Sequence, residues 1–223
     1  MAGAPAQLPD VAVNSFVSSL SRQPWFAAVG EPLTESECGD AQEYLRLLGF
    51  ATAETRSVPT WQAAEKIIRD PHWDKRWWDA EEKLRLQLLG PLIATWGEHT
   101  VMSRLTQVTD EATRVTLGAA SVAAARANLA DPALTRAASG AATQACYQEL
   151  LTEIAGIDED HSFRAKFRLF AAGRWPLGLV GDALRVLTRQ KTSLKNRRRP
   201  EFMGPEFHDI AAKTGRRRPE ESS

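Results

Sequence analysis

The sequence predicts an all-α fold, a multi-helix bundle, and three observations lead to this prediction. Over most of the chain, apolar residues recur every three or four positions, which is the spacing of one helix face. The centre of the chain is rich in alanine, the residue with the highest helix propensity. The 223 residues are 43% hydrophobic and 25% charged, which excludes wholly disordered, collagen-like and multi-span membrane chains. We therefore expect roughly six to eight helices between Val11 and Ala172.

Composition divides the chain into three parts. Residues 1–10 carry Pro5 and Pro9 and no charge before Asp10, so we expect a flexible lead there. Residues 11–187 are expected to form the helical domain, which ends in a small β-hairpin. Residues 188–223 contain ten basic and five acidic residues, with two runs of three arginines, and are expected to be a disordered basic tail.

The first two helices have recognisable ends. Apolar residues at helical spacing predict a short helix over Val11–Leu20, which Pro24 ends. Thr34 is followed three positions later by Glu37, which is the capping-box pattern of a helix N-terminus. Gly49 stands where a left-handed residue would close that second helix.

The next stretch predicts a loop and two helices. Residues 51–59 have no clear hydrophobic period and are interpreted as a loop. Thr60 can cap a helix that stops at Asp70-Pro71, because the residue before a proline avoids helical geometry. A further helix is predicted over Asp74–Leu89, ended by Gly90-Pro91.

The centre predicts an alanine-rich antiparallel helical hairpin over Asp110–Gly156, with its turn at Asp131-Pro132. Small residues let two helix backbones approach closely. The alanines that could meet across this hairpin are Ala119, Ala123 and Ala127 on one arm and Ala138, Ala142 and Ala145 on the other. The alternative is that alanine merely raises helix propensity.

The last elements are one more helix and a hairpin. Phe163, Phe167 and Phe170 lie at helical spacing, and Gly173 ends that helix. Two apolar runs then flank Gly181-Asp182, a dipeptide that suits a two-residue hairpin turn. An isolated hairpin is marginal, so we expect it to lie against the helices, with a continuing helix as the alternative.

Charge and cysteine content narrow the function classes. The formal net charge is zero, so nothing supports a whole-chain polyanion binder. Cys38 and Cys146 have neither metal nor disulfide spacing, which fits a reducing compartment. The N-terminus lacks the pattern of a secretory signal, and no run is long enough to span a membrane. The expected location is the cytoplasm of a bacterium.

Tryptophan is the most informative residue type. The chain has seven, and four of them fall between Trp61 and Trp78. A tryptophan-rich binding face is predicted, because indole rings offer a large apolar surface and one N–H donor; the alternative is that they fill the core. The candidate binding residues are Trp73, Arg76, Trp77 and Trp78 on this face, and Arg174 and Trp175 in the rigid segment 173–178. For that segment the alternative is a structural corner.

The sequence evidence for a catalytic site is weaker than that for a binding face. The candidates are His99 and His161, as acid–base groups or metal ligands, together with Glu98. The histidines lack the Glu-x-x-His spacing of helical di-metal sites, so no metal site is assigned. The sequence has no Gly-x-Ser-x-Gly elbow and no glycine-rich phosphate-binding motif, so no cofactor is expected.

Two function classes stay open. The first is a non-enzymatic interaction or accessory protein that binds a protein partner through its tryptophan-rich face. The second is a helical enzyme with a tryptophan-lined pocket that uses histidine and glutamate chemistry. Nucleic-acid binding through the basic tail is a weaker third. No resemblance to a known family is specific enough to name one, and oligomeric state and partner identity stay open.

Overall fold

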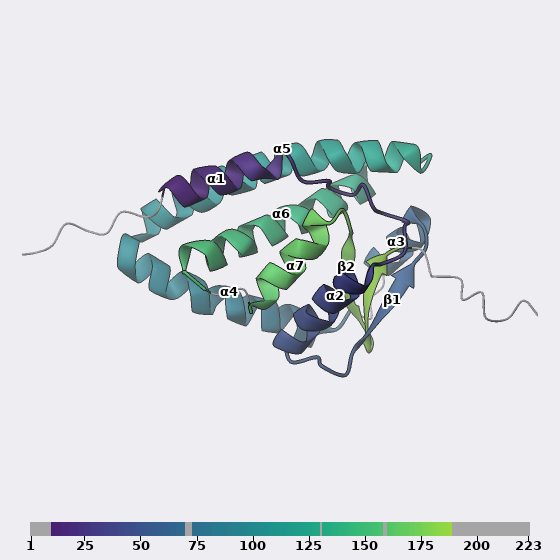
Figure 1. Cartoon of the computed structure of the whole chain (residues 1–223), viewed down its shortest axis with the longest axis horizontal. Helices are drawn as coiled ribbons and strands as arrows, with labels where there is room; N and C mark the ends of the chain where they lie inside the picture. The colour runs from purple at the N-terminus through teal and green to yellow at the C-terminus, as the bar shows by residue number, and fades with distance from the viewer. Residues whose placement is uncertain (1–9, 70–72, 130, 158–159, 189–223) are drawn as a thin grey trace, which may run out of the picture. The chain divides into compact units, whose positions relative to one another are not determined.

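The computed structural model describes residues 10–69, 73–129, 131–157 and 160–188 (Figure 1). Most of these residues are helical, as the sequence predicts. The helices are α1 (Asp10–Leu20), α2 (Glu35–Leu47), α3 (Trp61–Ile68), α4 (Lys75–Trp96), α5 (Glu98–Arg126), α6 (Pro132–Ile154) and α7 (Ser162–Ala171). The strands are β1 (Glu54–Val58), β2 (Pro176–Val180) and β3 (Ala183–Leu187). The predicted lead and basic tail lie outside the described residues, apart from Asp10 and Thr188.

Side-chain caps start several of these helices. The Thr34 hydroxyl accepts from the Glu37 amide, and the Glu37 carboxylate accepts from the Thr34 amide at 2.6 Å, so the predicted capping box is present. At the start of α3 the Thr60 hydroxyl accepts from the Ala63 amide, without a reciprocal side-chain bond. Asp131 accepts from the Ala133 amide at 2.8 Å at the start of α6.

Two predicted helix boundaries are wrong, one at the end of a helix and one at a start. The helix expected to stop at Leu89 continues as α4 through Pro91 to Trp96. Leu92 is buried there and Ile93 packs on the core, and this packing outweighs the roughly 3 kcal/mol that an interior proline costs. The helix expected to start at Asp110 begins at Glu98 as α5, because Val101, Leu105 and Val108 already present a buried face.

Helices α5 and α6 lie along each other, and α6 runs between α4 and α5 (Figure 1). Ala138, Ala142 and Ala145 are buried on α6. On α5 the buried alanines are Ala112, Ala120 and Ala124, whereas the alanines that the sequence indicated on this helix are only partly buried. Thr116 and Ser139 share a hydrogen bond of 2.8 Å across the two helices, so this contact is partly polar.

The sheet has three strands in the order β1–β3–β2. Strands β2 and β3 pair antiparallel on either side of Gly181-Asp182. The loop interpretation of residues 51–59 is wrong for β1, which pairs parallel to β3 from Glu54↔Ala183 to Val58↔Leu187. Of the β1 side chains only Val58 is buried, so the strand is stabilised by a distant partner that no local pattern reveals.

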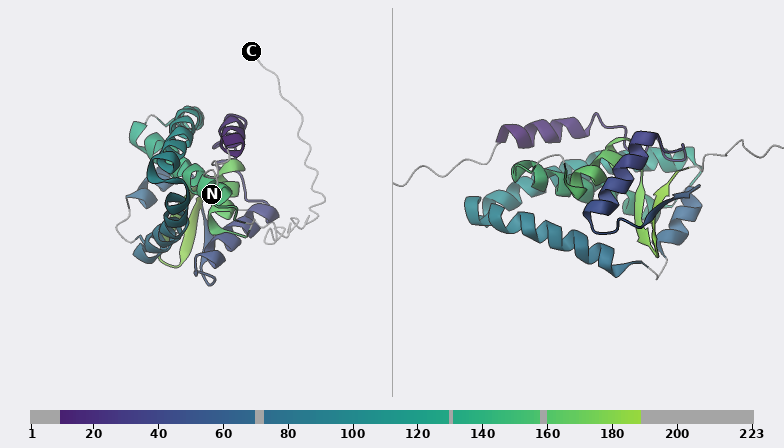
Figure 2. Two further views of the ribbon diagram at one scale, coloured as in Figure 1. Left: turned by 90° about the vertical axis from the view of Figure 1, so that its left-hand side faces the viewer. Right: turned by 60° about the horizontal axis from the view of Figure 1, so that its bottom comes forward.

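Figure 2 shows the sheet at one end of the helices, beside α2 and α3. The start of α4 reaches this sheet, where Trp73 bridges to Val180 and the Asp74 amide donates to the Leu179 carbonyl at 3.1 Å. This junction positions the tryptophans described below. Among the helices of the described residues, none is long and apolar enough to cross a membrane.

Candidate functional site

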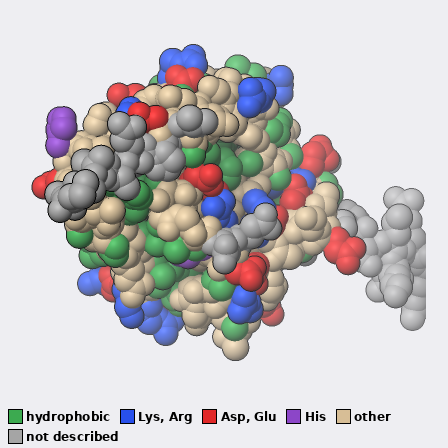
Figure 3. Space-filling model, turned by 60° about the vertical axis from the view of Figure 1, so that its left-hand side comes forward, with side chains coloured by type: hydrophobic (Ala, Val, Ile, Leu, Met, Phe, Trp, Pro, Cys, Tyr) green, Lys and Arg blue, Asp and Glu red, His purple; other side chains and the backbone are tan. Residues whose placement is uncertain are grey.

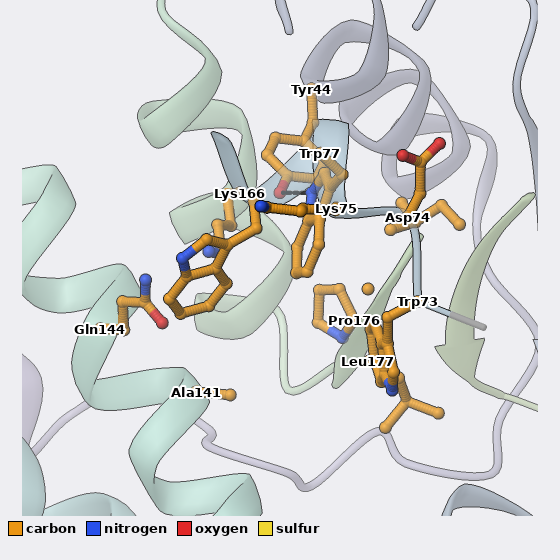
Figure 4. A pocket seen from close by; sticks show the side chains of 13 residues that line it. Tyr44, Trp73, Asp74, Lys75, Trp77, Ala141, Gln144, Lys166, Pro176 and Leu177 are labelled. Atoms are coloured by element: carbon orange, nitrogen blue, oxygen red, sulfur yellow. Dashed lines mark hydrogen bonds between the residues drawn. The ribbon is translucent and has the colours of Figure 1, made fainter. Parts of the chain in front are cut away.

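A cavity of about 460 Å³ lies between the start of α4, the helices α6 and α7, and the β2–β3 pair (Figure 4). Its volume falls in the range of small-molecule sites. Its lining is mostly apolar and aromatic. The lining residues are Tyr44, Trp73, Asp74, Lys75, Trp77, Trp78, Ala141, Gln144, Lys166, Pro176, Leu177, Gly178 and Leu184.

Three tryptophans form one wall of this tryptophan-lined cavity. Trp73 and Trp77 are stacked, with ring centroids 5.9 Å apart and an interplanar angle of 26°. Trp78 meets Trp77 edge to face at 6.3 Å, and its side chain is 53% exposed. Two rings are therefore half-buried in the wall, and the third stands at the rim.

The stack rests on Gly178 of β2. A Cβ atom at this position would overlap Cζ3 of Trp73 and lie 2.8 Å from Cη2 of Trp77. The backbone of Gly178 also has a φ of +130°, which side-chain-bearing residues rarely adopt. Only glycine lets both indole rings lie directly against the strand.

A buried polar cluster holds Trp77 from the other side. The Trp77 indole N–H donates to the Tyr44 hydroxyl at 2.7 Å, and that hydroxyl donates to Glu81 at 2.5 Å. The Lys166 ammonium donates to both Glu81 oxygens at 2.7 and 2.9 Å, and the Gln148 amide donates at 3.2 Å. These five residues come from α2, α4, α6 and α7.

The cluster keeps a charge pair away from water. Glu81 is 2% exposed and Lys166 6%, and burial of such a pair is costly unless hydrogen bonds satisfy its groups. Burial and the Glu81 charge raise the pKa of Tyr44 well above its ordinary value, so its hydroxyl stays protonated and keeps donating. The orientation of the Trp77 ring is thereby fixed before any ligand arrives.

Of the predicted binding residues, Trp73, Trp77 and Trp78 line this cavity, whereas Arg76 faces outward. Two guanidinium hydrogen bonds, at 2.7 and 3.1 Å, tie Arg76 to Asp74. Its guanidinium lies 6.0 Å from the Phe50 ring centroid, so its aromatic neighbour is a phenylalanine. Arg76 lines a second, adjoining cavity of about 470 Å³ that shares Trp73.

Arg174 and Trp175 are buried away from the tryptophan-lined cavity. Arg174 forms a bidentate pair with Glu37 at 2.8 and 2.9 Å and donates to three carbonyls, those of Ala28, Glu31 and Pro32. Trp175 packs among core aromatic rings and is 1% exposed. Both side chains are therefore engaged by contacts within the protein. This agrees with the alternative interpretation of segment 173–178 as a structural corner.

The predicted catalytic candidates lie elsewhere. Glu98 and His99 are exposed in the first turn of α5. His161 caps α7, where its Nδ1 accepts from the Phe163 amide at 3.2 Å, and burial lowers its pKa. Within the described ranges, no three His, Cys, Asp or Glu side chains lie close enough together to hold a metal ion.

Sequence reasoning missed Tyr44, Glu81, Gln144 and Lys166 as site residues. Two of them left a signal. Glu81 lies on the apolar stripe of Trp77 and Leu84, and Lys166 lies between Phe163 and Phe170 at helical spacing. A charged residue within the apolar face of a helix indicates a buried partner of opposite sign, and the two helices supply one charge each.

Comparisons with known proteins assign this chain to no family. No protein-family model matches the chain, and no curated protein or solved structure matches it significantly.

Proposed function

We propose that the protein is a non-catalytic binding protein whose recognition site is the tryptophan-lined cavity, and that this cavity takes up the flat, apolar body of a small molecule. The observation that carries the proposal is the Trp73–Trp77 stack, which rests on Gly178 on one side and is held by Tyr44 on the other. A planar aromatic ligand would bind well to such a wall, because offset and edge-to-face ring contacts contribute binding energy beyond the burial of apolar area.

Preorganisation supports this function. A ring that is already fixed loses little conformational freedom on binding, so more of the contact energy appears as affinity. Trp77 is fixed by its hydrogen bond to Tyr44, and Trp73 by its contact with Gly178 and a 3.3 Å hydrogen bond from its indole to the Ile68 carbonyl. Rigid aromatic walls of this kind are typical of binding sites.

Acid–base catalysis is less well supported. Both oxygens of Glu81 already accept hydrogen bonds from the protein's own side chains, so this carboxylate offers no free base to a substrate. His99 and His161, on which the enzyme alternative depends, do not line the tryptophan-lined cavity.

A protein partner is a second candidate, favoured by exposed apolar residues on α4. Trp78 and Leu86 are each 53% exposed, and they stand on one helix eight positions apart, so they share a face. On the face drawn in Figure 3, acidic and basic side chains are interspersed rather than gathered by sign. This mixture of signs differs from the one-sided basic patch of a nucleic-acid-binding surface.

Calorimetric titration with 2-naphthamide, a flat and uncharged probe, tests the proposal. Trp78→Ala should weaken binding roughly fivefold, since one aromatic contact is lost. Leu86→Ala is the matched control, because it removes an equally exposed apolar side chain of the same helix and should leave binding unchanged. Absence of naphthamide binding to the unaltered protein, or equal weakening by both substitutions, would contradict the proposal.

A further inference from the structure

We infer that the ligand of the tryptophan-lined cavity is an anion, a carboxylate attached to a flat apolar body. This inference rests on the proposed function and specifies its ligand. It derives from the charges that line the cavity rather than from its aromatic wall.

The charged lining residues are two lysines and one aspartate, Lys75, Lys166 and Asp74. Asp74 caps α4 and is neutralised by Arg76 through two guanidinium hydrogen bonds. Lys75 is exposed, and among the described residues no carboxylate lies within ion-pair distance of it. Lys166 is paired with Glu81 in the same manner, so the net positive charge that the described lining presents to a ligand comes from Lys75.

Lys166 supplies a directed donor. An ammonium group has three N–H bonds, and those of Lys166 that are used within the described part of the chain point to the two oxygens of Glu81. The ammonium also lies 5.9 Å from the Trp77 ring centroid, and in the complex that we infer its third N–H donates to the ligand acceptor. The Lys166 side chain is almost fully buried, and a hydrogen bond between two charged groups is strong in such surroundings. Figure 4 shows Lys166 and the Gln144 amide across the cavity from Pro176 and Leu177.

This arrangement orients the ligand. The apolar body lies between the tryptophan rings and Pro176, and the carboxylate points toward Lys166 and Gln144. A cation is the main alternative, since aromatic rings also attract cations. Here a ligand cation would lie beside Lys75, whose charge no carboxylate of the described residues offsets, and like charges repel.

Three probes with the same two-ring body separate these cases: 2-naphthoate is an anion, 2-naphthamide is neutral, and 2-naphthylmethylamine is a cation. Calorimetric titrations of the full chain should give naphthoate about tenfold tighter binding than naphthamide, the gain of one charge-assisted hydrogen bond. The amine should bind most weakly. Added salt should reduce the preference for naphthoate.

Two variants locate the preference. Lys75→Met removes the exposed charge without disturbing the core and should reduce the naphthoate preference, whereas Lys83→Met, at an exposed lysine of the same helix outside this cavity, should not. Glu81→Gln/Lys166→Met removes the buried pair as a unit and should abolish the remaining preference. Equal binding of naphthoate and naphthamide would overturn the inference alone. Absence of naphthamide binding would contradict the proposed function itself.

Discussion

Lys166 and Glu81 form an ion pair at 2.7 Å although both side chains are almost fully buried. The pair joins α7 to α4, and through Tyr44 it determines where Trp77 lies. The same charges thus connect two packed helices and position one wall of the tryptophan-lined cavity. The two roles are separable by experiment.

Breaking the pair should be costly. Lys166→Met leaves Glu81 charged and buried without its partner, and we expect a loss of about 3–5 kcal/mol in the free energy of unfolding. Adding Glu81→Gln should recover much of this loss. Urea denaturation measures both. The control is Arg46→Met, which breaks an exposed pair with Glu43 and should change stability little. A Lys166→Met variant as stable as the control would contradict the role of the pair.

Gly178→Ala should disrupt the tryptophan stack. The new methyl group would overlap Trp73 and the backbone would be strained at a φ of +130°, so we expect weaker naphthamide binding and a loss of at least ~1 kcal/mol in stability. Gly39→Ala is the matched control, since its Cβ meets nothing within 4 Å and alanine is the better helix former. Unchanged near-ultraviolet circular dichroism and binding in Gly178→Ala would refute this account of the stack.

Arg174 should matter for stability and not for ligand binding. Arg174→Met leaves Glu37 buried without its charged partner and removes one donor from each of three carbonyls, so we expect a loss of about 3–5 kcal/mol in the free energy of unfolding. Naphthamide affinity of the folded fraction should be unchanged. Weaker binding at full stability would instead place Arg174 in the recognition site.

His161 should make stability depend on pH. Burial lowers its pKa in the folded state, so on acidification the unfolded chain takes up the proton first, and stability falls as the pH drops from about 6.5 through the folded pKa. His161→Asn keeps a capping side chain but does not titrate. Its unfolding free energy should decline less between pH 7.5 and 5. An identical decline in both proteins would show that His161 is not the group responsible.

The sequence indicates much of this fold because the signals at helix starts are local. Thr34, Thr60 and Asp131 each mark a helix start, and each caps one. Local signals do not predict an element whose formation depends on contacts with residues far away in the sequence. The helix α4 passes Pro91 because Leu92 packs on the core, and β1 forms because β3 lies beside it.

The candidate site, like the fold, was only partly predictable from the sequence. Trp73, Trp77 and Trp78 are close in sequence, and their clustering predicted a shared face. The partners that hold this wall, Tyr44 and Lys166, lie far away along the chain, and Gly178 belongs to a segment in which Arg174 and Trp175 attract more attention. Only the tertiary contacts show which residues of that segment reach the cavity.

The most direct measurement is a titration of the uniformly nitrogen-15-labelled protein with 2-naphthoate, in which the indole N–H signals of the seven tryptophans are followed by NMR. The account expects the signals of Trp73, Trp77 and Trp78 to shift with one common binding curve, while those of Trp25, Trp61, Trp96 and Trp175 stay in place. Shifts confined to the second group, or none at saturating ligand, would contradict a binding site in the tryptophan-lined cavity.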